Sequence, residues 1–214
     1  FGFQSVAAQE LFVFTEPASN MAAKSIGFRA TNYLVDDDYS SNTVYMLMPE
    51  VMWGVSKKLM IHANVFLSNR KQVDGFITNP KQQFLLEGGS VYAKYRFYSA
   101  DDVHSHFRMA VYTRYSFNNS HIHEYAINLT GGNSGYEGGL IATKLINKVA
   151  ISASASFLHA QDNGSKKFLF GNKSRNAVNY TLSVGKLMLP KEYTGFKQTN
   201  VNMMLEMLGQ TNLN

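Results

Sequence analysis

Two pairs of histidines are the residues whose type and spacing could most directly bind a metal ion. One residue separates His104 from His106, and one residue separates His121 from His123. Glu124 directly follows the second pair. Residues i and i+2 of a β-strand share a face, so either pair on a strand could chelate Cu²⁺, Ni²⁺ or Zn²⁺. The pattern described below places the first pair at a turn and the second in a long loop at the opposite end of the strands. The two pairs cannot form one site, and we predict no metal site and no cofactor.

Other residue patterns argue against catalysis. The chain has no cysteine, which excludes disulfides, thiolate metal sites and thiol nucleophiles. No G-x-S-x-G motif of a serine hydrolase occurs. The glycine-rich run Gly131–Gly135 lacks the Lys-Ser/Thr pair of a phosphate-binding loop. We therefore predict that the protein is not an enzyme.

The elements that position the polar residues are strands. Alternation of apolar and polar residues dominates the chain, and period 2 is typical of β-structure. A weak helical pattern occurs only around Met203–Leu208. The pattern predicts strands at Ser25–Val35, Thr43–Trp53, Lys58–Asn69, Ser90–Tyr98, His106–Phe117, Ser134–Leu145, Val149–Gln161, Asn176–Leu189 and Thr194–Leu208.

The connections between these strands alternate between short and long. The long ones are Arg70–Gly89, Asn118–Asn133 and Asp162–Arg175. Short periplasmic turns, longer outer loops and strands of about 9–12 residues are typical of an outer-membrane barrel. We therefore predict an all-β fold, an antiparallel up-and-down transmembrane β-barrel. Because single-chain bacterial barrels have an even number of strands, nine strands predict that the complete protein has about 10–14.

The candidate functional residues share the polar face of the strands. In a membrane barrel this face lines the lumen, whereas in a soluble calycin-like barrel it faces water and Leu and Ile fill the inside. Tyr and Phe near the strand ends suit the interfacial girdles of a membrane barrel. The predicted lumen-facing residues are Arg29, His62, Asn64, Lys94, Arg96, Arg108, Arg114, Glu137 and Glu206.

Four of these residues form a basic ladder across adjacent strands: Lys94, Arg96, Arg108 and Arg114. Such a ladder in a lumen could favour anions. The alternative is a structural network that fills a narrow interior, with Glu50, Glu137 and Glu206 as partners.

Composition excludes further classes. The 214 residues leave room for one domain, and they are 45% hydrophobic and 16% charged, which argues against disorder. The net charge is +5, but lysines and arginines are scattered, so we predict no nucleic-acid partner. The longest uncharged apolar stretch, Val149–Gln161, is too short for a membrane helix, and a membrane protein here would have to be a barrel.

The N-terminal residues resemble an export signal followed by a mature barrel. Small residues precede Gln9, so we expect residues 1–8 to be the remnant of a signal peptide and residues 9–214 to form the barrel domain. The stretch Glu10–Leu34, ELFVFTEPASNMAAKSIGFRATNYL, resembles outer-membrane β-barrels of the porin or transporter kind from Bacteroidota-type genomes. The resemblance implies an architecture and an outer-membrane location, and it names no substrate or site residue.

These expectations leave three functions open. The first is passive passage or binding of small solutes by a barrel in the outer-membrane bilayer. The second is a structural or interaction barrel whose long loops bind a partner protein. The third is a soluble calycin-like barrel that binds an apolar ligand.

Overall fold

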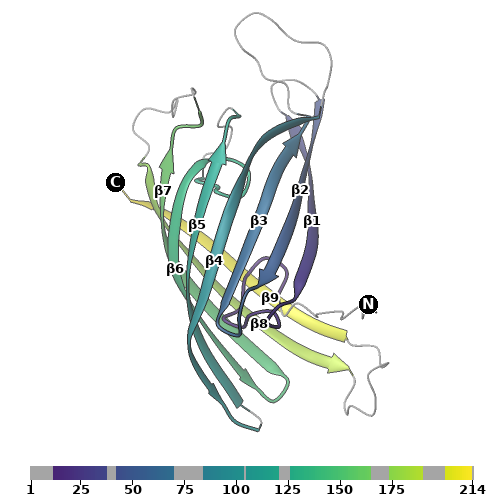
Figure 1. Cartoon of the computed structure of the whole chain (residues 1–214), viewed down its shortest axis with the longest axis vertical. Coiled ribbons are helices and arrows are strands. Elements are labelled where there is room, and N and C mark those ends of the chain that lie inside the picture. Colours follow the sequence, from purple (N-terminus) through teal and green to yellow (C-terminus); the bar gives the residue numbers. More distant parts are fainter. Residues whose placement is uncertain are drawn as a thin grey trace, which may run out of the picture.

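The chain folds into one antiparallel sheet. The computed structural model describes residues 12–37, 42–69, 84–103, 105–120, 126–164, 174–189 and 201–213. Each strand pairs with the next one along the chain, in the order β1 to β9, and the sheet curls into a half-barrel (Figure 1). In the part of the chain that the structure describes, β1 and β9 are the two edges and do not pair with each other. The strands are β1 (Ile26–Asp37), β2 (Asn42–Gly54), β3 (Leu59–Ser68), β4 (Leu85–Asp101), β5 (Ser105–Asn118), β6 (Ser134–Ile146), β7 (Val149–Gln161), β8 (Asn176–Leu189) and β9 (Val201–Leu213).

The prediction of an all-β, antiparallel, up-and-down sheet of nine strands is thus confirmed. The up-and-down order places the connections β2–β3, β4–β5 and β6–β7 at one end of the sheet, the lower end in Figure 1, here called the turn end. The opposite end is called the loop end. The β6–β7 turn has two central residues, and Asn147 adopts the positive φ of 51° that tight hairpin turns favour.

The largest differences from the predicted strand bounds are in β4 and β9, and β4 also ends at Asp101 rather than Tyr98. β4 begins at Leu85 rather than Ser90, because Gly88 and Gly89 pair with neighbouring strands instead of forming a loop. A Cβ at Gly89 would lie only 2.6 Å from the Asn64 carbonyl oxygen, so glycine serves close strand approach here. β9 runs to Leu213 rather than Leu208, so the weak helical pattern in this region is strand. Residues 194–200 of the predicted ninth strand lie outside the described residues.

The pairing of β2 with β3 is interrupted in the middle of the two strands. Leu47 pairs with Leu67 and Glu50 pairs with Asn64, but no pair lies between them. Pro49 occupies this gap and has no N–H to donate to a ladder. A hollow of about 550 Å³ lies over the same stretch, and its lining is mostly apolar.

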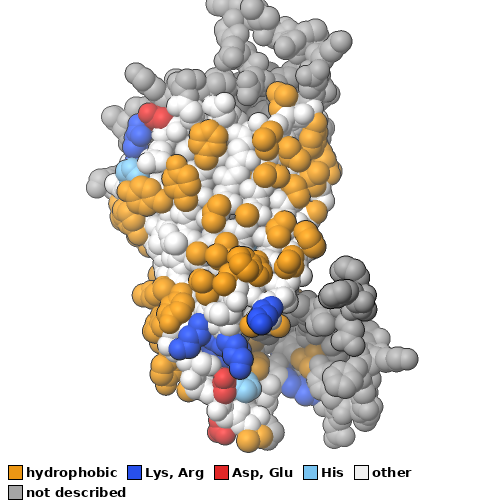
Figure 2. Space-filling model, in the orientation of Figure 1, with side chains coloured by type: hydrophobic (Ala, Val, Ile, Leu, Met, Phe, Trp, Pro, Cys, Tyr) orange, Lys and Arg blue, Asp and Glu red, His pale blue; other side chains and the backbone are white. Residues whose placement is uncertain are grey.

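The convex face of the sheet is apolar. Phe28 is 79% exposed and Leu205 is 65% exposed, and exposed Leu, Val, Ile, Phe and Tyr side chains occur on all nine strands. Figure 2 shows hydrophobic side chains spread over the middle of the visible wall, with Lys, Arg, Asp and Glu towards its lower end and a further group of charged side chains at the upper left. Five aromatic residues near the strand ends, as predicted for interfacial girdles, are exposed on this face: Trp53, Tyr98, Phe117, Tyr136 and Phe157. Tyr33 is also exposed, but it lies on the same face of β1 as Arg29.

The concave face carries the buried polar side chains, mixed with apolar ones such as Met60 and Phe66, and is covered by the chain itself. Residues 12–21, here called the inner segment, cross this face near the turn end and bond to β4, β5, β6, β8 and β9. Its Ala18 is fully buried against Ala110 and Ile141. This polarity, with polar groups inside and apolar groups outside, is the reverse of the one that a soluble barrel requires.

A second inward fold covers the concave face near the loop end. Residues 126–133, here called the inner loop, bury Ile127 and Leu129 against Leu158, Ala160 and Ala177. The Gln210 side chain accepts a bond from the Ile127 N–H and donates one to the Ile127 carbonyl, both at 2.9 Å. This part of the predicted outer loop Asn118–Asn133 therefore lies in the interior. No helix long and apolar enough to cross a membrane occurs among the residues that the structure describes.

Candidate functional site

The ladder of strand pairs brings six polar side chains together on the concave face. Glu50 on β2 lies opposite Asn64 on β3, which lies opposite Ser90 on β4. One step towards the turn end, His62 lies opposite Tyr92, and Tyr92 lies opposite Arg114 on β5. Because residues directly opposite each other share a face, the register alone places these side chains side by side.

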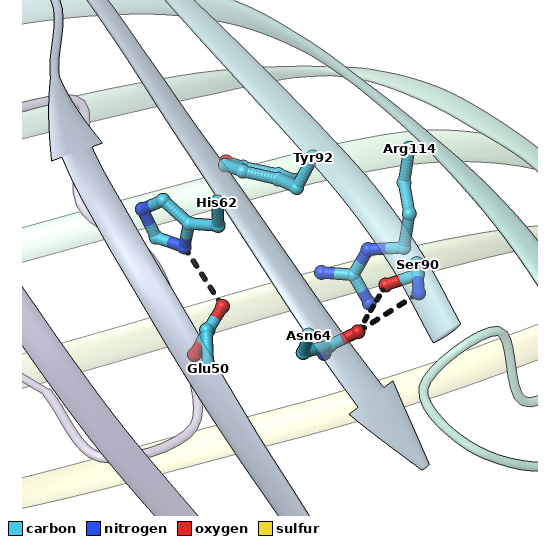
Figure 3. A pocket seen from close by; sticks show the side chains of 6 residues that line it. All are labelled: Glu50, His62, Asn64, Ser90, Tyr92 and Arg114. Atoms are coloured by element: carbon cyan, nitrogen blue, oxygen red, sulfur yellow. Dashed lines mark hydrogen bonds and ion pairs between the residues drawn. The ribbon is translucent and has the colours of Figure 1, made fainter. Parts of the chain in front are cut away.

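These six side chains line a small cavity (Figure 3). Its volume is about 10 Å³, which is about the room that one water molecule needs. On β4, Ser90 and Tyr92 precede Lys94, which contacts the inner segment. On β5, Arg114 precedes Asn118, whose side chain bonds to the inner loop. The cavity therefore lies between the two inward folds.

Glu50 is already fully engaged on one side of the cavity. Arg29 donates from Nε to Glu50 Oε2 at 2.8 Å, and His62 Nδ1 lies 3.0 Å from Glu50 Oε1. Both carboxylate oxygens therefore have cationic or hydrogen-bonding partners, and Glu50 joins β1, β2 and β3.

Three polar atoms around the cavity have no hydrogen-bond partner among the described residues. They are His62 Nε2, the Tyr92 hydroxyl and Arg114 Nε. His62 is 3% and Tyr92 is 4% exposed. Buried polar groups are almost always hydrogen-bonded, so three unpartnered atoms at one cavity make it the candidate binding site of the sheet.

Arg114 is held loosely by its carboxylate neighbour. Its Nε lies 3.8 Å from Glu137 Oε2, and its guanidinium lies 5.4 Å from the centre of the Tyr92 ring. Glu137 Oε1 accepts hydrogen bonds from Tyr112 at 2.8 Å and Ser156 at 2.7 Å. Figure 3 shows the guanidinium turned into the cavity, towards Asn64.

Lys94 is the most deeply buried charge of the site. Its side chain is 0% exposed, and Nζ donates to Glu16 Oε2 at 3.0 Å, to the Pro17 carbonyl at 2.7 Å and to the Ser19 carbonyl at 2.9 Å. An ammonium group has three donors, and the inner segment accepts all of them. Lys94 therefore holds the inner segment to the sheet.

Glu206 holds the other end of the inner segment. Its carboxylate accepts the backbone N–H groups of Val13 at 2.8 Å, Phe14 at 3.1 Å and Thr15 at 2.9 Å. Charge-assisted bonds of this kind are about twice as strong as neutral ones. A residue that the sequence offered as a partner for the basic ladder thus binds backbone amides instead.

The basic ladder is largely divided among separate partners. Arg96 donates to the Lys57 carbonyl at 2.8 Å, and Arg108 donates to Asp101 and to the Ser19 hydroxyl. His106 also bonds to Asp101, at 2.9 Å. The described residues contain no group of three or more His, Asp or Glu that could hold a metal ion. Residues His104, His121, His123 and Glu124 lie outside the described residues.

Two residues of the site could not be identified from the sequence. Glu16 precedes the first strand, so no alternation pattern assigns it a face, yet it reaches Lys94 and lies 3.8 Å from Arg29. Tyr92 lies on the same face of β4 as Lys94, but tyrosine suits either face of a strand, so the alternation pattern does not single it out. Register would have shown that it lies opposite both His62 and Arg114.

The charge of Glu16 should make the inner segment sensitive to acid. Burial by itself would raise the pKa of Glu16, but Lys94, His62 and Arg29 outweigh it, so the pKa lies below its ordinary value of 4.5. A carboxylate with a lowered pKa stabilises the folded state above the ordinary value, and this contribution is lost as the pH falls through the lowered one. We expect protease cleavage within residues 12–21 to increase below pH 4.5, as followed by mass spectrometry with an acid-active protease.

The variant Glu16→Gln is the control for this pH dependence. It removes the titrating group, so its cleavage should be faster than in the wild type at pH 7 and should change less on acidification. An equal acid response in both proteins would show that other carboxylates release the segment.

Comparisons with known proteins add no relative to these observations. No protein-family model matches the sequence, and searches of curated proteins and of solved structures find no significant match.

Proposed function

We propose that the chain forms a transmembrane β-barrel of a bacterial outer membrane that binds or passes small polar solutes through its interior, without catalysing a reaction. The observation that carries the proposal is the polarity of the two faces. Lys94 is fully buried on the concave face while Phe28 is 79% exposed on the convex face. In water such a wall would expose apolar surface at a cost of about 25 cal/mol per Å². In a bilayer the same wall is in its preferred solvent.

The lengths of the strands and the positions of the lysines on the outer wall support this proposal. The strands have 10 to 17 residues, enough to cross the hydrocarbon core at a tilt. Lys144 and Lys186 are exposed on the outer wall, and both lie near the turn end of their strands. Charges at the edge of an apolar band are typical of an interface with lipid headgroups.

The proposal includes closure of the sheet into a barrel. An open edge in a bilayer leaves backbone N–H and C=O groups without partners, at several kcal/mol for each group. The free edges of β1 and β9 must therefore pair, either with each other or with further strands. An even total of about 10–14 strands satisfies this requirement.

The test is expression with the native export signal, followed by fractionation and gel electrophoresis with and without boiling. We expect extraction from the outer membrane only by detergent, and a band whose mobility changes on heating. The same sample in a planar bilayer should then show conductance or solute-dependent noise. A protein that stays in the soluble fraction and shows no heat shift would contradict the membrane proposal.

A second function is favoured by a specific observation. The inner segment and the inner loop occupy the concave face from both ends, and the cavity between them has room for about one water molecule. A filled lumen suits a structural or interaction barrel whose long loops bind a partner protein. The two functions differ in one measurement: a variant that releases the inner segment should raise conductance in a solute-passing barrel and leave it at zero in an interaction barrel.

A further inference from the structure

The cavity between the inward folds offers mainly hydrogen-bond donors. Arg114 has only donor groups, and its nearest carboxylate is 3.8 Å away. Asn64 uses its Oδ1 to accept bonds from the Ser90 N–H at 3.0 Å and the Ser90 hydroxyl at 2.8 Å, which leaves its amide NH₂ as a donor. The hydroxyl of Tyr92 is free to donate as well.

The carboxylate at the cavity is already engaged. Among the described residues, Glu50 is the only carboxylate that lines the cavity, and both of its oxygens are bound, by Arg29 and His62. His62 faces Glu50 with Nδ1, so its Nε2 is the ring atom left without a partner. With Nδ1 donating to Glu50, Nε2 of the neutral ring is an acceptor and adds no donor to the cavity.

We propose that this cavity binds one small monovalent anion of about the size of chloride. The ligand must be small, because the cavity measures about 10 Å³. It must accept bonds, because Arg114, Asn64 and Tyr92 present donors. An anion site would narrow the solutes of the proposed function to anions, and its biological meaning rests on that function. The binding chemistry itself depends only on these side chains.

The anion explains one feature that a neutral filling leaves open. It gives the cation of Arg114, whose carboxylate neighbour Glu137 lies at 3.8 Å and beyond hydrogen-bond distance, a charged partner in direct contact. A single water molecule in the same space could satisfy the hydrogen bonds, including that of the Tyr92 hydroxyl, but would leave Glu137 as the only charged partner of Arg114 among the described residues.

The first experiment locates the ion. Crystals of the full chain in detergent are grown or soaked with sodium bromide, and anomalous diffraction is measured at the bromine edge. We expect a peak within hydrogen-bond distance of Arg114 and Tyr92. A water-sized peak without anomalous signal, at bromide concentrations that label surface sites, would overturn the proposal.

The second experiment measures binding in solution. Thermal unfolding is followed at constant ionic strength while chloride replaces gluconate, which is too large for the cavity. A ligand that binds only the folded state raises the unfolding temperature in a saturable way. We expect saturable stabilisation by chloride in the wild type, and affinity at least tenfold weaker in Arg114→Met.

Arg108→Met is the matched control, because Arg108 is also a concave-face arginine but bonds to Asp101 and Ser19 outside the cavity. It should keep the chloride response of the wild type. Tyr92→Phe keeps the ring and removes only the hydroxyl, and we expect its chloride affinity to be reduced severalfold. This variant tests the proposal even if Arg114→Met fails to fold. Equal unfolding temperatures in chloride and gluconate for the wild type, or an unchanged response in Tyr92→Phe, would overturn the anion site.

The failure of this inference can be told apart from failure of the proposed function. Heat-modifiable mobility and extraction from the outer membrane depend on the apolar wall and not on the cavity. A membrane-inserted protein without a chloride response would support the barrel proposal and contradict the anion site. A soluble protein with a chloride response would contradict the membrane barrel and support the anion site.

Discussion

Replacing Lys94 with methionine is expected to lower the free energy of unfolding by about 3–5 kcal/mol and to release the inner segment. Methionine keeps much of the volume of the lysine side chain but removes all three donors. Glu16 then loses its nearest cation, and the carbonyls of Pro17 and Ser19 lose their donor. Removing one partner of a buried ion pair costs about this much, and among the described residues Glu16 then keeps only the more distant ion pair with Arg29, at 3.8 Å.

Urea unfolding in phospholipid vesicles, read from the heat-modifiable band, measures the loss of stability. Limited proteolysis followed by mass spectrometry measures release, with new cleavage expected within residues 12–21. Arg96→Met is the control, because Arg96 makes an exposed bond to a turn carbonyl, and it should cost less than about 1 kcal/mol.

A double variant separates the ion pair from the carbonyl contacts of Lys94. When Glu16→Gln is combined with Lys94→Met, no unpaired carboxylate remains. The double variant should therefore lose less free energy of unfolding than the sum of the losses in the two single variants. Conductance of Lys94→Met in a planar bilayer then distinguishes a solute-passing barrel from an interaction barrel. An inner segment that stays protected in Lys94→Met would show that Glu206 and backbone contacts hold it without the lysine.

The strands could be predicted from the sequence because one face of each is apolar. A half-apolar strand has a strict period of 2, and β7 carries it without interruption, so its predicted bounds match the structure. The bounds of β6 and β8 are also within a residue of the predicted ones. The pattern fails where glycine removes it. Gly88 and Gly89 carry no side chain to alternate, and a loop was predicted where β4 continues.

The candidate site could be predicted only in part, because alternation assigns a face but not a partner. Arg29, His62 and Lys94 were placed on the polar face, and they do lie on the concave side of the sheet; a role for them in a lumen stays a prediction. Their partners depend on register and on a segment that has no periodicity. The alternation pattern therefore did not predict that Glu16 or the inner loop would lie on the concave face, where Glu16 binds Lys94 of the basic ladder.

A charge placed in the middle of the outer wall should be the most direct test of the membrane proposal. Leu140 is the central residue of β6 and is 52% exposed on the convex face. In a bilayer, Leu140→Arg is expected to lower the free energy of unfolding by about 2–4 kcal/mol, since arginine at the midplane of a barrel costs this much. In water the same exposed substitution would change stability by at most about 0.5 kcal/mol.

The same strand supplies a matched control at a different depth. Ile146 lies on the same face as Leu140 at the turn end of β6, is 44% exposed, and stands two residues from the exposed Lys144. Ile146→Arg should cost only about 0–1 kcal/mol, because the penalty for arginine falls towards the interface. Urea titration in vesicles gives both values. Equal small losses at the two positions would contradict a bilayer around this wall, because only an apolar solvent of finite thickness makes the cost of one charge depend on its position along a strand.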